Sequence, residues 1–379
     1  MGLPITITLL SSALFLLSPS GYSLADTTHS KAPLQPAQAS VKSQMKSQDL
    51  RALSAAIKAL IDDASQPFSG SVILLEDGKA QLALQKGEGI DQNSSFVVAS
   101  LSKQITATLV LRAVDAGKLD LTRSLNSYLF ADETNDGAKQ NAVEQHRYDE
   151  RITLHHLLSH TSGVDALGKA NRFAPGSQFQ YSNHGYTLLG LVLEKVNKQA
   201  FAEQVAQFAK DNQLNALYAQ TGSIEHIRRN LTTLAVGFDE ADTLIAANID
   251  IDESLLPGGG LIASAPTFAS FAHKLHSGEL LSPKSYELMT RAHTKMEFFW
   301  PNMSYGYGLR LNSDDGLREY SHTGYLPGYM SMSLHYPEFN LDLVMLENIS
   351  LNLNDMERVF ELHNQIRQAV RVHLLHKKS

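Results

Sequence analysis

The sequence predicts an α+β protein, because helices and antiparallel strands are expected at both ends of the chain and mainly helices between them. Near the N-terminus an amphipathic helix precedes a hairpin, and near the C-terminus two paired strands precede another amphipathic helix. The chain has 379 residues, 43% hydrophobic and 19% charged, which suits one large domain or two smaller ones. Its net charge of −7 gives no reason to expect a nucleic-acid partner, which would need clustered Lys and Arg.

The first residues are typical of a secretory signal peptide. An apolar run from Ile5 to Leu17 is too short to span a bilayer, and Ser23-Leu24-Ala25 provides a small-x-small cleavage pattern. We expect cleavage after Ala25, so that residues 1–25 are removed and the mature protein is periplasmic or secreted. No Lys or Arg precedes the apolar run, so an uncleaved membrane anchor is the alternative. No later segment is long and apolar enough to cross a membrane.

The rest of the chain divides by composition. Residues 26–48 are rich in Ser, Gln, Lys and Thr, and they are expected to form a flexible linker. A single folded domain is then predicted over 49–376. Its α/β part comprises about 49–118 and 300–376, and its mainly helical part comprises about 119–299.

The domain is expected to begin with a helix, a hairpin and a second helix. Asp49 can cap the first helix, whose apolar side chains recur at helical spacing: Leu50, Leu53, Ile57, Leu60 and Ile61. Two strand-like segments, the first beginning at Ser69, flank Asp77-Gly78, a dipeptide typical of hairpin turns. A helix from Ser100 to Ala116 is apolar on most faces, which indicates a central, buried position. Gly117 suits its left-handed cap.

The helical part contains an acidic segment and a histidine cluster. The polar segment from 131 to 151 is interpreted as a surface loop, with a substrate rim as the alternative. A short helix is predicted over 152–163, and it carries His155, His156 and His160. These histidines do not share one helical face, and no H-E-x-x-H pattern occurs, so structural roles are favoured over a metal site. We expect no metal or organic cofactor, and the absence of cysteine excludes thiolate chemistry.

The remaining elements follow from periodicity. A helix is predicted from about Gly185 to Val196, and amphipathic helices continue to about residue 230. The glycine run after Pro257 lacks the Gly-Lys-Ser/Thr of a phosphate loop and precedes a helix with Pro266 near its first turn. Strands are predicted at 305–311, 329–336 and 341–346, the last two paired, before a closing helix from about 355.

The stretch Ser100-Leu101-Ser102-Lys103 combines a nucleophile with a base. Ser100 and Lys103 are three residues apart and therefore lie on one face of the predicted helix. Unpaired N–H groups at the helix start favour a developing oxyanion. Burial would lower the pKa of Lys103, so that its amine could accept the serine proton. A helix cap and a solvated lysine are the alternatives.

Two further elements complete a candidate site. In Tyr181-Ser182-Asn183, the phenol of Tyr181 can shuttle protons beside a cation, and the amide of Asn183 can orient Lys103 and substrate. In His322-Thr323-Gly324, the glycine would let substrate lie against a strand, and His322 could donate a hydrogen bond to substrate or to Tyr181. The backbone N–H groups of Ser100 and Tyr325 would form the oxyanion hole. An N-cap and a strand-entry turn are the alternatives.

Together these stretches resemble the serine β-lactamase and penicillin-binding protein superfamily, closest to its class C β-lactamase, D-peptidase and esterase branch. The matching stretches are the Ser69 hairpin, Ser100–Lys103, Leu154–Gly163, Tyr181–Asn183, the glycines from Gly258, Tyr305-Gly-Tyr-Gly and His322–Gly324. The resemblance implies a β-lactamase/transpeptidase-like fold, in which terminal helices flank an antiparallel sheet beside an all-helical subdomain.

The resemblance also implies roles for the residues. Ser100 would be the acylated nucleophile, Lys103 and Tyr181 would share the proton transfers, and Asn183 would hold the acyl side chain. His322, Thr323 and Gly324 would line the substrate. Familiar β-lactamases carry a lysine at the position of His322, and histidine supplies only part of its charge near neutral pH.

We therefore expect an acyl-enzyme serine hydrolase of the esterase or D-peptidase type, acting on a small molecule or peptide. A true class C-like β-lactamase is the first alternative. A non-catalytic penicillin- or peptidoglycan-binding module is the second, and an interaction protein that uses the acidic segment is the third. The sequence leaves the natural substrate and the oligomeric state open.

Overall fold

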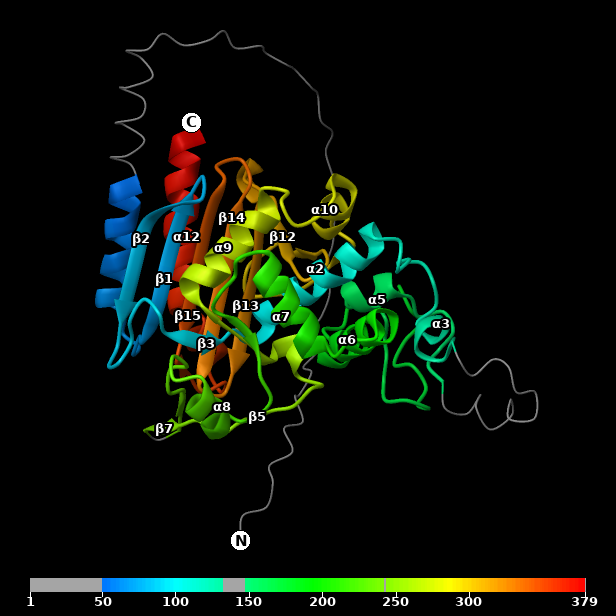
Figure 1. Cartoon of the computed structure of the whole chain (residues 1–379). Coiled ribbons are helices and arrows are strands. Elements are labelled where there is room, and N and C mark those ends of the chain that lie inside the picture. Colours follow the sequence, from blue (N-terminus) through cyan, green and yellow to red (C-terminus); the bar gives the residue numbers. More distant parts are fainter. Residues whose placement is uncertain (1–49, 132–146, 242, 379) are drawn as a thin grey trace, which may run out of the picture. The chain divides into compact units, whose positions relative to one another are not determined.

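The computed structural model describes residues 50–131, 147–241 and 243–378, and an antiparallel sheet forms the centre of this part (Figure 1). The sheet has eight strands in the order β10-β11-β12-β13-β14-β15-β1-β2. They are β1 (Gly70–Glu76), β2 (Lys79–Lys86), β10 (Thr294–Lys295), β11 (Ser304–Tyr305), β12 (Arg310–Asn312), β13 (Glu319–Leu326), β14 (Tyr329–Tyr336) and β15 (Leu341–Glu347). The predicted α+β class is confirmed. The expected signal peptide, the linker and most of the acidic segment lie outside the described residues.

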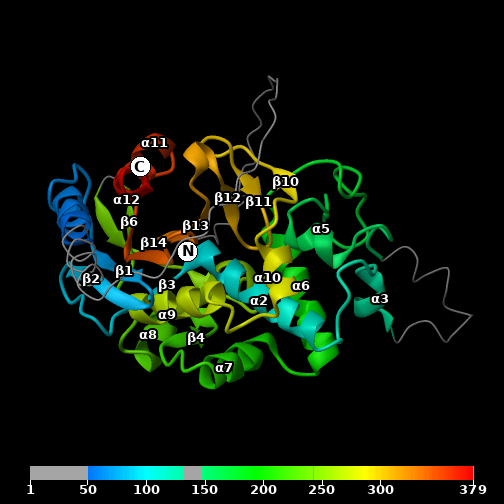
Figure 2. The ribbon, with the colours of Figure 1, turned by 90° about the horizontal axis from the view of Figure 1, so that it is seen from above.

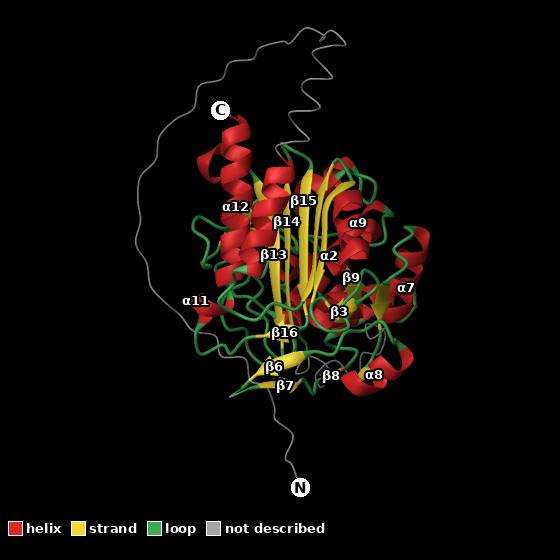
Figure 3. Ribbon diagram, turned by 90° about the vertical axis from the view of Figure 1, so that its left-hand side faces the viewer, coloured by secondary structure: helices red, strands yellow, loops and turns green. Residues whose placement is uncertain are grey.

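Helices cover both faces of this sheet (Figure 3). Val72 and Leu74 of β1 belong to a core shared with a helix over residues 50–62 and with α12 (Glu361–Lys378). Ile73 and Leu75 point to the opposite face, where α9 (Ala265–His276) packs against β1 and β15. This alternation follows from the two-residue period of a strand. The two predicted terminal helices therefore cover one face.

The predicted hairpin is confirmed by its turn. Asp77 and Gly78 have φ of 52° and 71°, which is the left-handed pair that a two-residue hairpin turn requires. Gly78 also lies against α9, because a Cβ there would stand 2.6 Å from Nε2 of His273. The Asp77-Gly78 turn is therefore compatible both with the twist of the two strands and with the close packing of α9.

The helical part of the domain lies beside the sheet, with α2, α5 and α6 close together (Figure 2). Besides α9 and α12, the helices are α2 (Ser102–Asp115), α3 (Asn126–Leu129), α5 (Leu154–Leu158), α6 (Asn183–Asn197), α7 (Phe201–Asp211), α8 (Ile224–Asn230), α10 (Pro283–Met289) and α11 (Met356–Val359). Within the described ranges, no helix has both the length and the apolarity that a membrane span requires.

Several short strands outside the central sheet were not predicted. They form three small sheets, made of β3 (Ser95–Val97), β9 (Leu261–Ser264) and β4 (Leu217–Ala219), of β16 (Ile349–Ser350), β6 (Phe238–Glu240) and β7 (Leu244–Ala246), and of β5 (Gly222–Ser223) and β8 (Asp250–Ile251). Strands of two to four residues are too short to show a period. β3 and β9 are also buried on both faces, so their sequences show no alternation of apolar and polar residues.

The helix predicted over 152–163 is shorter than expected. Thr153 and His156 form a capping box that starts α5, and the helix already ends at Leu158. His160 then has a φ of 59°, a left-handed conformation that is uncommon for a residue other than glycine and that ends helical geometry. The backbone turns here toward Tyr181, because the N–H of Gln180 donates to the carbonyl of His160 at 2.8 Å.

Candidate active site

Ser100 lies in a short 3₁₀ turn (Ala99–Leu101) between the buried strand β3 and helix α2. Ala99 has a φ of 48°, so the residue before the serine is in a strained, left-handed conformation of the kind found at functional sites. Backbone bonding holds the turn, because the N–H of Val98 donates to the carbonyl of Leu261 at 2.9 Å. Ser100 is partly exposed between buried neighbours, so its hydroxyl can be reached.

Lys103 is fully buried and hydrogen-bonded in three directions. Its Nζ lies 3.3 Å from Oγ of Ser100, 2.7 Å from Oδ1 of Asn183 and 2.5 Å from the carbonyl oxygen of Gly258. The rings of Tyr181 and Tyr186 flank it, with centroids 4.8 Å and 5.5 Å from Nζ. The structure thus brings Ser100 and Lys103 together with Tyr181 and Asn183 from a distant part of the sequence, as predicted.

The surroundings of Lys103 lower the pKa of its amine. Burial lowers the pKa of the Lys103 amine, and the positive charge of Arg310 lowers it further, while Tyr181 acts in the opposite direction. No carboxylate of the described residues forms an ion pair with Lys103. An amine that has lost its proton could accept one from Ser100 across the same 3.3 Å contact.

Tyr181 lies beside Lys103 with its hydroxyl unused. The hydroxyl is buried and has no hydrogen-bond partner among the described residues, although buried polar groups are normally paired. The His160 ring packs at a tilt against the Tyr181 ring with centroids 4.3 Å apart, and its Nδ1 accepts a hydrogen bond from the N–H of Ser182 at 3.1 Å. Nε2 of His160 is likewise buried and unpaired. The sequence suggested only a structural role for His160, yet its ring positions the Tyr181 segment.

His322 is fully buried in β13, and neighbours use both of its ring nitrogens. Nδ1 donates to the carbonyl of Thr323 at 2.7 Å, which leaves Nε2 to accept from the hydroxyl of Tyr305 at 3.0 Å. Burial, Arg310 and Lys103 lower the pKa of His322 well below its usual value, so the ring is neutral near pH 7. Of the two alternatives for His322, the hydrogen bond to Tyr181 is absent, because both ring nitrogens have other partners and the Tyr181 hydroxyl has none among the described residues.

Arg310 supplies the positive charge that His322 does not. Its side chain is 6% exposed, its Nη1 donates to Oγ1 of Thr323 at 2.7 Å, and its guanidinium lies 3.9 Å from the ring centre of Phe298. Its Nε is buried without a partner. Arg310 is a residue that sequence reasoning missed. The sequence feature that could have identified it is a single charged residue in the otherwise uncharged, strand-like segment Tyr307-Gly-Leu-Arg-Leu.

The predicted oxyanion hole depends on a close approach of β13 to the serine turn. A Cβ at Gly324 would stand 2.9 Å from the backbone nitrogen of Ser100 and 2.9 Å from Cβ of Ala99, so only glycine fits there. Ser331 supports the contact from β14, because its hydroxyl donates to the carbonyl of Val98 at 2.8 Å. Tyr325 follows Gly324, and its own hydroxyl donates to Leu351, away from the serine.

One edge of β13 is open beside this contact. β14 pairs with β13 from Tyr320 to Leu326, whereas β12 on the other side pairs only with Glu319 to Ser321. In the described part of the chain, no strand therefore pairs with 322–326 on that side. An extended peptide could add to this edge through main-chain hydrogen bonds.

Three histidines that are buried or half-buried predict a loss of stability in mild acid. Burial lowers the pKa of His160 and His322, and it lowers the pKa of His155 to about 4. An unfolded chain takes up protons at these residues below about pH 6.5, whereas the folded chain does not, so stability falls as the pH decreases. We expect the thermal midpoint to fall by at least about 3 °C between pH 7 and pH 5.

Calorimetry of this chain and of His155→Gln measures the effect. The His155→Gln variant should lose less stability over the same pH interval, whereas His226→Gln, which removes an exposed histidine, should behave as the parent does. A midpoint that is unchanged or higher at pH 5 would contradict the neutral state of the buried rings.

Comparisons with known proteins fit this geometry. A family model described as Beta-lactamase matches residues 55–367, which include every candidate residue named above. Protein flp of Staphylococcus aureus (strain MW2) is 24% identical over 316 residues, covering 74% of this chain and 59% of flp. The match thus spans less than two thirds of the length of that relative.

Solved structures show the same fold. A D-amino acid amidase from Ochrobactrum anthropi SV3, complexed with L-phenylalanine, is similar with a TM-score of 0.68 and 19% identity, over 86% of this chain and 100% of the amidase chain. A β-lactamase/D-alanine carboxypeptidase from Pseudomonas syringae has a TM-score of 0.67 and 18% identity, over 84% of this chain and 99% of that chain.

Proposed function

This chain belongs to the Beta-lactamase family of serine hydrolases, and from that premise we propose that it cleaves an amide, peptide or ester bond through an acyl-enzyme on Ser100. The observation that supports this most is the buried Lys103, whose Nζ lies 3.3 Å from Oγ of the partly exposed Ser100. A buried amine beside a reachable hydroxyl is the arrangement that activates a serine.

In the proposed acylation, Oγ of Ser100 attacks the substrate carbonyl while its proton passes to Lys103 and Tyr181 jointly. The carbonyl oxygen becomes an oxyanion, which the N–H groups of Ser100 and Tyr325 stabilise. When the intermediate collapses, the leaving nitrogen or oxygen takes the proton and the acyl group remains on Ser100. Water then attacks the ester with Tyr181 as the base, and the same steps release the acid.

Arg310 suggests which substrates the site prefers. A buried guanidinium with an unpaired Nε, next to Thr323 at the end of the open edge of β13, fits a carboxylate on the leaving side of the scissile bond. We therefore propose a peptidase-like or amidase-like preference for substrates with such a carboxylate. β-Lactams of the penicillin type carry a carboxylate too, so their hydrolysis is the second candidate function.

A non-catalytic binding module fits the site less well. Lys103 is a buried amine without an ion-pair partner among the described residues, and burying such a titratable group costs stability unless a function keeps it. Neither candidate needs a metal ion or an organic cofactor. The mature protein is proposed to act in the periplasm or outside the cell.

Covalent labelling tests the proposal. We expect a fluorophosphonate to label the protein at Ser100, and the adduct to disappear in Ser100→Ala, whose fold should be unchanged because the hydroxyl is not part of the core. A fluorescent penicillin, used in parallel, separates the two candidate functions. Lasting penicillin adduct without turnover favours the peptidase, and rapid turnover favours the β-lactamase. If neither reagent forms a Ser100-dependent adduct, the acyl-enzyme proposal is wrong.

A further inference from the structure

A second cluster of titratable side chains lies on the α9 face of the sheet, outside the candidate active site. It consists of His273 and His276 from α9, His335 from β14 and Asp342 from β15. One ligand atom each from His276, His335 and Asp342 lies within 4.8 Å of the other two. Imidazole nitrogens and a carboxylate oxygen are ligands that suit Zn²⁺ and related transition-metal ions.

The fold places these residues together by simple rules. His273 and His276 are three residues apart and share one face of α9. His335 and Asp342 are directly opposite each other in the pairing of β14 and β15, so their side chains leave the sheet on the same side. Because α9 packs on these strands, the helical pair meets the cross-strand pair.

Asp342 is the centre of the cluster, and its charge is not balanced by a fixed cation. Its side chain is completely buried, and its ion pairs in the described residues are with histidines alone: Nδ1 of His335 at 2.8 Å and Nδ1 of His273 at 3.6 Å. The second distance is too long for a hydrogen bond, so Oδ2 of Asp342 and Nδ1 of His273 both lack a hydrogen-bond partner. A buried carboxylate in this state is costly unless a cation joins it.

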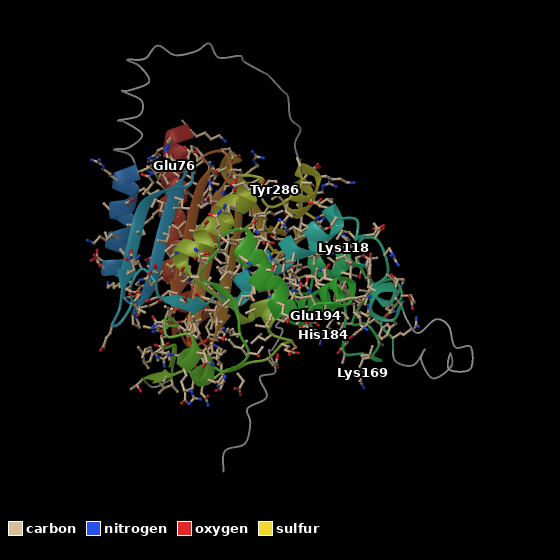
Figure 4. The ribbon with its side chains drawn as sticks, in the orientation of Figure 1. Glu76, Lys118, Lys169, His184, Glu194 and Tyr286 are labelled. Atoms are coloured by element: carbon tan, nitrogen blue, oxygen red, sulfur yellow. The ribbon has the colours of Figure 1, made fainter. Side chains whose placement is uncertain are left out.

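The surroundings support His276 as a metal ligand. Its Nδ1 lies 3.0 Å from the hydroxyl of Tyr286, the α10 residue labelled in Figure 4. This contact leaves Nε2 available, and ligating histidines usually bond through their other nitrogen to such an outer partner. His276 stacks on His335 with centroids 3.8 Å apart, so the two rings must rotate out of this stack to direct one nitrogen each at a shared ion. His273 and His276 are partly exposed, which gives an ion a route to the buried carboxylate.

From these contacts we propose that His276, His335 and Asp342 form a binding site for one divalent transition-metal ion of the Zn²⁺ type, with His273 as a further ligand. Tetrahedral Zn²⁺ bonds of this kind place ligand atoms about 3.4 Å apart. The 4.8 Å cluster therefore closes by rotation of the histidine rings when the ion enters. The ion would neutralise Asp342 and connect α9 to β14 and β15.

Metal titration of the untagged, full-length protein, first stripped with a chelator, tests this site. We expect one equivalent of Zn²⁺ to bind and to raise the thermal midpoint. We also expect Co²⁺ to show the visible absorption of a four-coordinate site with histidine ligands. Asp342→Asn and His276→Gln should each weaken binding at least tenfold. Tyr286→Phe, which changes only the outer partner, should weaken it about tenfold.

Two controls keep the outcome clear. His226→Gln removes an exposed histidine elsewhere and should bind Zn²⁺ as the parent does. His276→Gln alters a partly exposed side chain and should fold even if Asp342→Asn does not. Absence of stoichiometric binding by the parent, or equal affinity in the parent and in His276→Gln, would overturn the site. Neither result bears on labelling of Ser100, so the two proposals fail independently.

Discussion

Replacing Lys103 by methionine should lower the rate of Ser100 acylation by at least about 10³-fold while the protein stays folded. The amine is the group nearest to Oγ of Ser100 that can take its proton, and methionine has similar length without a base. The fold should tolerate the change, because removing the desolvation cost of the buried amine offsets the loss of its hydrogen bonds to Asn183 and Gly258. Single-turnover labelling and a thermal midpoint together measure both effects.

Lys103→Arg is the informative control for this prediction. Arginine keeps the positive charge near Tyr181 but does not release its proton near neutral pH. If Lys103 acts as a base, the arginine variant should be as slow as the methionine variant. If arginine restored the rate, Lys103 would act only through its charge, and the proposed proton transfer would be wrong.

Replacing Arg310 by methionine should change selectivity more than overall activity. We expect kcat/KM for a substrate with a free carboxylate on the leaving side to fall about 10²- to 10³-fold, as for loss of a buried charge pair. The matching substrate with a neutral amide there should change by less than about threefold. Methionine keeps a long side chain against Phe298, whose ring lies 3.9 Å from the guanidinium.

Steady-state kinetics on the two substrates checks this ratio, and Arg310→Lys tests the geometry. A lysine keeps the charge without the planar guanidinium, so it should restore part of the selectivity. An equal fall for both substrates in Arg310→Met would contradict a role in carboxylate binding and would indicate a purely structural residue. The thermal midpoint of each variant separates that case from unfolding.

The parts of the fold and of the site that could be predicted are those that depend on residues close together in the sequence. Ser100 and Lys103 share a helical face by spacing alone, and Asp77-Gly78 specifies its own turn. Apolar periodicity also identified the helix at residues 50–62 and α12. In each case a short-range rule is enough to predict the outcome without knowledge of tertiary contacts.

The missed parts depend on contacts between distant residues. Arg310 reaches Thr323 only because β12 pairs with β13, opposite Ser321, and a single arginine in a short segment does not show that pairing. His160 reaches Tyr181 because its backbone turns left-handed after α5, a conformation without a composition signal for histidine. The neutral state of His322 likewise follows from its complete burial beside Arg310 and Lys103, and the motif His-Thr-Gly does not reveal that burial.

The shortness of β12 fixes the distance between the proposed carboxylate-binding residue and the nucleophile. β12 stops pairing at Ser321, so the free edge of β13 starts there, and Arg310 stands at that starting point. A peptide lying on residues 322–326 would run into the guanidinium at one end and past Ser100 beside Gly324. The bond presented to Ser100 would then lie at a set number of residues from the terminal carboxylate. With this fixed spacing, the proposed peptidase would cleave near chain ends and leave internal bonds intact. Peptides of increasing length would then all release a product of the same size.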